Sequence, residues 1–263
     1  MSTSHPSAAT LVLDFLAASA DRKMSAQALC CAGAIMGFSE ATIRVALTRL
    51  AQQKKIVKLE RASYALDTRR NRLQFDVENW RERVDWIAPW RGDWIIVADG
   101  MVDRVDKTGL RRHHRALLLR GFQKWKPGLH VRPNNLVGGA QALRQQLPQL
   151  GLANGAELFV ARDFDAKQSA ALSGLWNASA LRRGREKTLA RAETSRRRLA
   201  RMDTAAAARE TLLVGRELIG AVLHDPLLPP ELAPGVGIQK LAQAISDYQS
   251  LSRQIWDRAL AQA

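Results

Sequence analysis

Few residues in this sequence have the types and spacing that catalysis or metal binding requires. His113 and His114 are adjacent on an expected helix, so their side chains point about 100° apart and cannot easily share a metal ion. No third His or Cys is near them in the sequence, and we expect both on a basic surface with Arg111, Arg112 and Arg115. There is no Ser-His-Asp order and no phosphate-binding glycine loop, and VGGA at 137–140 is typical of a helix start. The sequence therefore predicts no enzyme, metal site or cofactor.

A different chemistry is available to the basic residues of GFSEATIRVALTRLAQQKKIVKLERASYALD, the stretch from Gly37 to Asp67. Arginine side chains bind phosphate oxygens or guanine bases in a forked geometry, and lysine side chains bind phosphates as point charges. Small hydroxyl side chains also contact the DNA backbone. We expect DNA contacts from nine residues: Ser39, Thr42, Arg44, Thr48, Arg49, Lys54, Lys55, Arg61 and Ser63.

The first part of this stretch has the pattern of a helix that follows another helix. Ile43, Leu47 and Leu50 recur at steps of three and four, which buries one helical face and leaves Arg44 and Arg49 elsewhere. Gly37 suits the C-terminal cap of a preceding helix, SAQALCCAGAIMGF, and Ser39 suits the N-cap of the next one. The sequence thus predicts helix, turn, helix.

After Gln53 the helical period changes to alternation, in IVKLE and YAL, with RAS between them as a short polar connection. A helix-turn-helix followed by a hairpin is the layout of a winged-helix DNA-binding domain, whose second helix enters the major groove. The alternative is a solvated surface helix, which a basic amphipathic pattern also fits. The hairpin directly behind the helix favours the winged helix.

The composition agrees with a folded protein that binds a polyanion. The chain has 263 residues, 46% of them hydrophobic, and a net charge of +15 from 40 basic and 25 acidic residues. The basic excess is distributed along the chain, so charge alone does not single out the winged domain. The segment Arg182 to Arg201 holds nine basic and two acidic residues. It fits either a second contact with DNA or a solvated helix face.

The cysteines and the hydropathy pattern indicate a cytoplasmic location. Cys30 and Cys31 are adjacent on an expected buried helix, where they rarely bridge and have no partner ligands for zinc. We interpret them as small core residues in a reducing compartment. No apolar run approaches the length of a membrane span, and LVLDFLAASA is expected to be the first helix of the winged domain, preceded by a frayed tail.

The rest of the chain adds two further domains, so the expected fold class is α+β multidomain. Residues 91–165 contain strand, helix, two strands turning at Pro127 and Gly128, helix and strand. This βαββαβ order predicts a ferredoxin-like sheet backed by two helices. Beyond it only helical periods occur. The expected domains are a winged helix (1–67), a linker helix (68–90), a ferredoxin-like central domain (91–165) and a helical C-terminal domain (166–263).

With these parts in order, the sequence resembles the PaaX family of bacterial transcriptional repressors. Three stretches carry the resemblance: TIRVALTRLAQQKKIVKLERASYALD, then RGDWIIVADG with GFQKWKPGLHVRP, and finally RETLLVGRELIGAVLHDPLLPPELAP. The resemblance implies a homodimeric repressor that leaves a double-stranded DNA operator when an aryl-coenzyme A thioester binds, typically phenylacetyl-coenzyme A. Leu212, Leu213, Leu218 and Trp256 are the candidates for the dimer interface.

The thioester implied by the resemblance would need cationic side chains for its phosphates and an apolar slot for its acyl group. Candidates for the first role are Arg111, Arg112, Lys124 and Lys126, and those for the second are Trp125 and Trp176. Arg216 and His224, in the C-terminal stretch, complete the set of effector-site candidates.

An enzyme remains as the alternative, because the central domain also resembles the small ferredoxin-like nuclease subunit of CRISPR adaptation. That resemblance implies a metal-binding aspartate at the end of the first strand, where Asp99 stands. Mg²⁺ normally requires further fixed oxygens, and only Asp103 and Asp106 are close in the sequence. A metal-dependent nuclease is thus the second function considered.

Overall fold

A computed structural model describes residues 6–19, 23–60, 62–67, 75–77 and 79–262 of the chain. These residues form two compact units. Unit 1 comprises residues 1–78, 190–219 and 244–263, and unit 2 comprises residues 79–189 and 220–243. Residues 166–263, which we expected as a separate helical domain, are divided between the two units.

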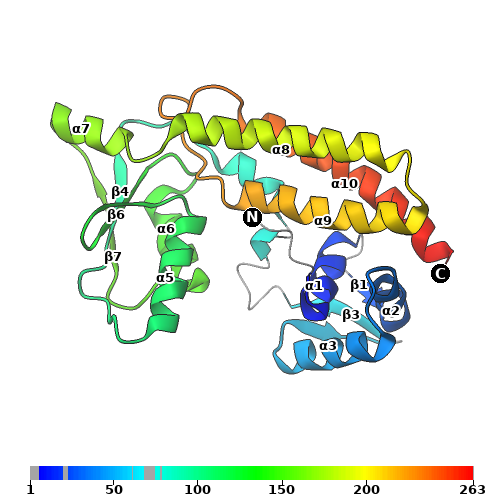
Figure 1. Cartoon of the computed structure of the whole chain (residues 1–263). Helices are drawn as coiled ribbons and strands as arrows, with labels where there is room; N and C mark the ends of the chain where they lie inside the picture. The colour runs from blue at the N-terminus through cyan, green and yellow to red at the C-terminus, as the bar shows by residue number, and fades with distance from the viewer. Residues whose placement is uncertain (1–5, 20–22, 61, 68–74, 78, 263) are drawn as a thin grey trace. The chain divides into compact units, whose positions relative to one another are not determined.

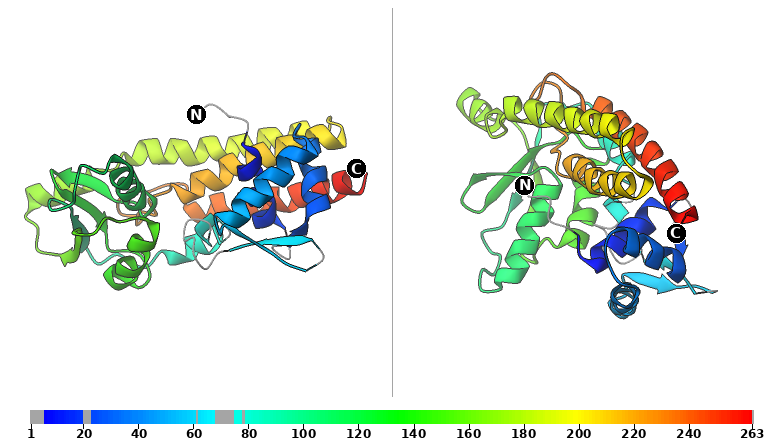
Figure 2. Two further views of the ribbon diagram at one scale, coloured as in Figure 1. Left: turned by 90° about the horizontal axis from the view of Figure 1, so that it is seen from below. Right: turned by 45° about the vertical axis from the view of Figure 1, so that its right-hand side comes forward.

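Unit 1 begins with three short helices and a small sheet (Figure 1). The helices are α1 (Ala8–Ala18), α2 (Ala26–Ile35) and α3 (Glu40–Gln52). The strands are β1 (Lys23–Ser25), β2 (Ile56–Lys58) and β3 (Ser63–Leu66), in the antiparallel order β1-β3-β2. Strand β1 was not expected from the sequence. The strands β2 and β3 lie side by side next to α3 (Figure 2).

The turn between α2 and α3 is built by local capping. Gly37 has a φ of +83°, and the amides of Gly37 and Phe38 donate to the carbonyls of Ala34 and Gly33. Ser39 Oγ then accepts the amide of Thr42 at 3.2 Å and begins α3. A Cβ on Gly33 would lie 2.4 Å from Ile43 Cγ1, so glycine is what permits the close approach of the two helices.

Each of the three long C-terminal helices has one part in unit 1 and the other in unit 2. They are α8 (Ala178–Leu199), α9 (Thr204–Leu223) and α10 (Ile238–Ala261). Within unit 1, the Phe15 and Trp256 rings pack edge to face, Arg209 donates to the Ile35 carbonyl, and Arg216 pairs with Asp14. The core of the N-terminal helices is thus continuous with the unit 1 parts of these helices.

Unit 2 is organised around a four-stranded antiparallel sheet of order β5-β6-β4-β7. Its strands are β4 (Trp94–Ala98), β5 (Gln123–Lys126), β6 (Leu129–Pro133) and β7 (Glu157–Ala161). The helices α5 (Lys107–Leu119) and α6 (Gly139–Leu150) alternate with them in the order βαββαβ and lie together beside the sheet (Figure 1).

The opposite face of this sheet is covered by residues from later in the chain. Trp94, Ile96 and Val131 project from that face and pack with Leu172 of α7 (Ala166–Ser173) and with Trp176. The Trp94 and Trp176 rings are stacked, with centroids 5.9 Å apart. Both faces of the central strands β4 and β6 are therefore covered within unit 2, whereas Phe159 and Val160 of the edge strand β7 are exposed.

Eight residues of the linker helix expected at 68–90, residues 68–74 and 78, lie outside the described residues. Nearer its expected end, the chain forms a short 3₁₀ helix, Glu82–Trp86, rather than an α-helix. Arg83 within it donates to the carbonyls of Leu119, Val222 and Asp225. The Leu119 and Val222 carbonyls lie at the C-terminal ends of α5 and α9, and the Asp225 carbonyl lies just beyond α9, so Arg83 donates to backbone groups at the ends of two helices.

Candidate functional site

The outward face of α3 carries the residues expected to read DNA. Ile43, Ala46, Leu47 and Leu50 are buried, while Arg44, Thr48 and Arg49 are exposed. Arg44 is already engaged, since its Nε donates to Glu40 Oε1 at 2.7 Å on the same face. This hydrogen bond raises the pKa of Arg44. The Thr48 hydroxyl donates to the Arg44 carbonyl at 3.1 Å, which leaves its methyl group as the outward part.

Sequence reasoning missed one residue on this face. Val45 is 68% exposed, which is unusual for a β-branched apolar side chain on a helix that has its own buried face. An apolar side chain at such a place can contact the methyl group of thymine. Its position outside the spacing of Ile43, Leu47 and Leu50 was the signal that could have identified it.

Three of the other expected DNA contacts have structural roles. Ser39 Oγ caps α3 and lies 2.8 Å from Thr42 Oγ1, so both hydroxyl groups are committed to the start of the helix. Lys54 has a φ of +55° and ends α3 in the left-handed conformation, with its amide bonded to the Ala51 carbonyl. Its side chain and that of Lys55 are exposed.

The expected contacts on the hairpin are only partly described. Ser63 is the first residue of β3 and pairs with Ser25 of β1, and its side chain is half-buried. Arg61 is outside the described residues. The exposed side chains of β2 and the following residue include Val57, Lys58 and Leu59.

The expected effector residues do not form one cluster. Trp176 and His224 line an open pocket of about 410 Å³ in unit 2. Trp125 packs edge to face on Phe164 and belongs to the hydrophobic core of the sheet, with Lys126 above its ring at 4.4 Å. Arg216 is in unit 1, where it pairs with Asp14. Arg111, Arg112 and Lys124 are exposed on α5 and β5, and none of them lines the pocket.

The pocket itself is mainly apolar, with Leu118, Leu175, Leu181 and Leu241 among its lining residues. It contains one ion pair that the sequence did not predict. Arg185 is held by both carboxylate oxygens of Asp225, at 2.8 and 2.9 Å, and both side chains are buried. The indole N–H of Trp176 is buried and has no hydrogen-bond partner, so it remains available to an acceptor.

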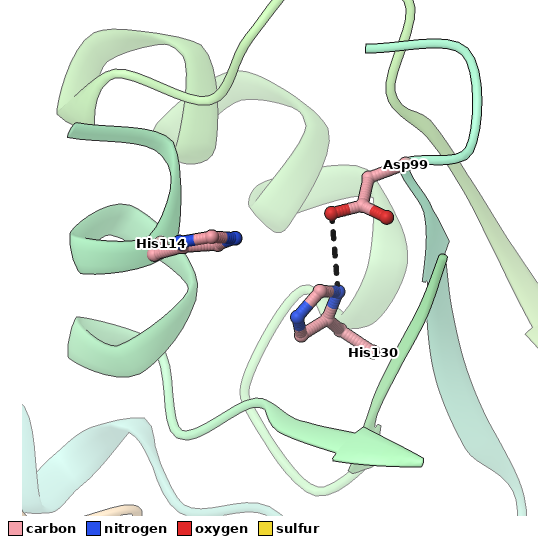
Figure 3. Close-up of side chains that lie close together, drawn as sticks. All are labelled: Asp99, His114 and His130. Carbon is pink, nitrogen blue, oxygen red and sulfur yellow. Dashed lines mark ion pairs between the residues drawn. The ribbon is translucent and has the colours of Figure 1, made fainter. Parts of the chain in front are cut away.

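A second cluster lies on the helix-covered face of the unit 2 sheet. Val97 and His130 face each other across β4 and β6, and alternation puts Asp99 on the same face as Val97. Figure 3 shows Asp99, His130 and His114 of α5 pointing toward one another. The ligand atoms of these three side chains all lie within 4.8 Å of one another. The sequence-based expectation of no metal site did not foresee this convergence.

His113 is buried, so the expectation that it lies on a basic surface is wrong. Position 113 is on the face of α5 that packs on the sheet, with Ala116 and Leu117. The Ala153 amide donates to His113 Nδ1 at 3.1 Å, so the other ring nitrogen carries the proton and donates to Asp99 Oδ2 at 3.2 Å. Burial lowers the pKa of His113 and that of His130, which favours their neutral forms. His114 is exposed, as expected.

The two carboxylates that follow Asp99 most closely in the sequence have other partners. Asp103 Oδ1 accepts the amide of Val105 at 2.8 Å, and Asp106 Oδ1 accepts the amides of Thr108 and Gly109 at the start of α5. These hydrogen bonds lower the pKa of Asp106. The groups that converge on Asp99 are therefore imidazoles, which a hard cation does not prefer.

The candidates for the dimer interface are largely internal. Leu212, Leu218 and Trp256 are buried in unit 1, and Leu213 is partly buried. Their apolar spacing reflects packing within one chain. The expectation that they form an interface is therefore wrong for the three buried side chains.

Comparisons with known proteins inform the fold alone. No protein-family model matches the chain, and no curated protein matches it. Among solved structures, the chain is similar to the uncharacterized protein Rv0674 from Mycobacterium tuberculosis, with 23% sequence identity and a TM-score of 0.61. The match covers 96% of this chain and 98% of that chain. Across the described residues, no helix combines the length and the apolar character that crossing a bilayer requires.

Proposed function

We propose that the protein is a DNA-binding transcriptional repressor of the PaaX type, with α3 as its recognition helix. The observation that carries the proposal is the division of α3 into a buried face and an outward face with Arg44, Thr48 and Arg49. Two arginine side chains on one helix surface suit base edges and phosphates, and the methyl group of Thr48 can contact that of thymine. The antiparallel β2–β3 pair next to α3 supplies the further contact surface that a winged helix uses.

The net charge supports the same proposal. A charge of +15 attracts a polyanion over a wide surface, and the exposed lysines 54, 55 and 58 follow α3 directly. One recognition helix buries too little surface to select a site in a genome. We therefore propose that the protein binds a palindromic operator as a two-fold dimer, in the cytoplasm. The dimer interface would be a surface other than the buried side chains of unit 1.

The proposed signal is an aryl-coenzyme A thioester that weakens DNA binding. The support is a mainly apolar pocket in unit 2 that Leu118, Leu175 and Trp176 line. Release of the operator requires a coupling of about 1 to 3 kcal/mol, and DNA must weaken the thioester's binding by the same factor.

The test is a gel shift of chromosomal fragments, taken from around the gene, with wild-type protein and with Arg49→Ala. Arg253→Ala, which removes an exposed arginine from α10, is the matched control. We expect a fragment-specific shift that Arg49→Ala weakens and Arg253→Ala retains. Equal binding by both variants would contradict the assignment of α3. Calorimetry with phenylacetyl-coenzyme A, with and without the shifted fragment, tests the signal separately.

The nuclease alternative receives no support from the arrangement around Asp99. The neighbouring side chains are imidazoles, and the two nearby aspartates bond to backbone amides. Incubation of the shifted fragments with Mg²⁺ or Mn²⁺ checks this directly, and intact DNA is the expected result.

A further inference from the structure

We propose that Asp99, His114 and His130 form a binding site for a first-row transition-metal dication, with Zn²⁺ as the reference ion. The three residues come from the end of β4, from α5 and from β6, and are separated by at least fifteen positions in the chain. The proposal concerns unit 2 alone and does not depend on DNA binding.

The distances suit an ion of this class. His130 Nδ1 lies 3.6 Å from Asp99 Oδ2, and the ligand atoms of all three residues lie within 4.8 Å of one another. Tetrahedral ligands at about 2.0 to 2.2 Å from Zn²⁺ are about 3.3 to 3.6 Å apart. The Asp99 and His130 atoms already have this separation. The exposed His114 side chain needs to move by only about 1 Å to complete the set.

Two buried polar atoms of the site have no hydrogen bond, although Arg104 Nη2 lies 3.7 Å from one of them, Asp99 Oδ1. Asp99 Oδ1 and His130 Nδ1 are buried without a hydrogen bond. Such atoms are costly in a folded protein, and a bound ion is one way to satisfy them. The exposed fraction of the His130 side chain is 12%, so this nitrogen is directed into the cluster rather than toward solvent.

The surroundings orient the ligands as a metal site requires. His113 donates to Asp99 Oδ2 and is itself fixed by the Ala153 amide, so the carboxylate is held by a chain of two hydrogen bonds. Two imidazoles and one carboxylate leave coordination positions open for water or a small ligand. The exposed His114 gives the ion a route from solvent.

Two cations oppose the ion. Arg104 Nη2 lies 3.7 Å from Asp99 Oδ1, and Lys124 faces His130 across β5 and β6. Both side chains are exposed and can turn toward water when an ion enters. Because these cations compete with the ion, we expect weaker Zn²⁺ binding than in a closed structural zinc site, with a dissociation constant in the micromolar range or lower.

The experiment uses the full chain without a histidine tag, stripped with a chelator and titrated with Zn²⁺ in a calorimeter at neutral pH. We expect one equivalent to bind, and His114→Ala to weaken binding at least about tenfold. His224→Ala is the matched control, because it removes an exposed imidazole outside the cluster. Millimolar Mg²⁺ is not expected to displace the Zn²⁺.

Titration with Co²⁺ identifies the ligands. Nitrogen and oxygen ligands give visible d–d bands without the near-ultraviolet charge-transfer band of a thiolate, so this spectrum is expected for wild type and is lost in His130→Gln. A thiolate band would assign the ion to Cys30 or Cys31 and overturn the proposal. Absence of Zn²⁺ binding, or equal affinity in wild type and the folded His114→Ala variant, would also overturn it.

Discussion

Arg44 provides the most direct test of the proposed recognition helix, because the structure shows its interactions in the free protein. Its guanidinium pairs with Glu40, four residues earlier on α3, at 2.6 Å, and its side chain is 61% exposed. An exposed pair at this spacing contributes little to helix stability, because water screens the two charges. Arg44→Ala should therefore leave the free energy of unfolding nearly unchanged.

The same substitution should have a larger effect on DNA binding. A bidentate contact with guanine contributes about 1 to 3 kcal/mol of discrimination, which is a loss of about fivefold to more than a hundredfold in affinity. Lys55→Ala, at an exposed position beyond the helix, should instead lower the affinity for all DNA sequences by the same factor. It should also reduce the dependence of that affinity on salt concentration. The two variants thus separate base reading from phosphate binding.

Glu40 provides the internal control for this prediction. Glu40→Gln removes a carboxylate that holds Arg44 and that would repel a phosphate, so we expect tighter DNA binding in the Arg44 background. In the Arg44→Ala background the gain should shrink, which a double-mutant cycle measures. Fluorescence anisotropy with the operator and with single-base variants, at fixed salt, is the assay. If the Arg44→Ala variant binds every sequence with the affinity of wild type, the assignment of Arg44 to a base contact is refuted.

Three further predictions concern other positions. Lys54→Gly should relieve the left-handed backbone and retain or raise thermal stability while it weakens DNA binding, whereas an unchanged affinity would remove Lys54 from the interface. Burial raises the pKa of Asp14 to about 6. Chemical denaturation should show wild type more stable relative to Asp14→Asn below pH 4 than at neutral pH, and this relative stability should be lost as the pH rises through 6. The expected loss is about 1 to 2 kcal/mol, because the 22% exposure of the Asp14 side chain reduces the effect. A Cβ at Gly121, where φ is +73°, would lie 2.5 Å from the Pro226 carbonyl oxygen, so Gly121→Ala should lower the free energy of unfolding by at least about 2 kcal/mol, and a melting temperature equal to wild type would contradict this.

Elements defined by local signals could be predicted from the sequence. The turn into α3 depends on Gly37 and Ser39, and the buried face of α3 depends on apolar residues one helical turn apart. The hairpin strands and the elements of the unit 2 sheet have similar local patterns. Strand β1 has only three residues and exists because it pairs with β3, so no local pattern marks it.

Features that depend on distant residues could not be predicted in the same way. Arg83 and Arg185 are charged in the sequence and buried in the fold, because partners 36 to 142 positions away accept their hydrogen bonds. The apolar spacing of Leu218 and Trp256 indicated burial but not against which surface. Likewise, the sequence near His114 does not reveal the other two residues of its cluster, because Asp99 and His130 are distant in the sequence and come together only in the fold.

The charges around the unit 2 pocket constrain what kind of effector it can hold. Among the described residues that line the pocket, Arg185 is the one arginine, and Asp225 already neutralises it through both carboxylate oxygens. Moving Arg185 to a phosphate would leave Asp225 buried without a counter-charge, which is strongly unfavourable. The pocket therefore suits the apolar end of a ligand. The phosphates of a coenzyme A thioester would have to bind at exposed cations outside the pocket.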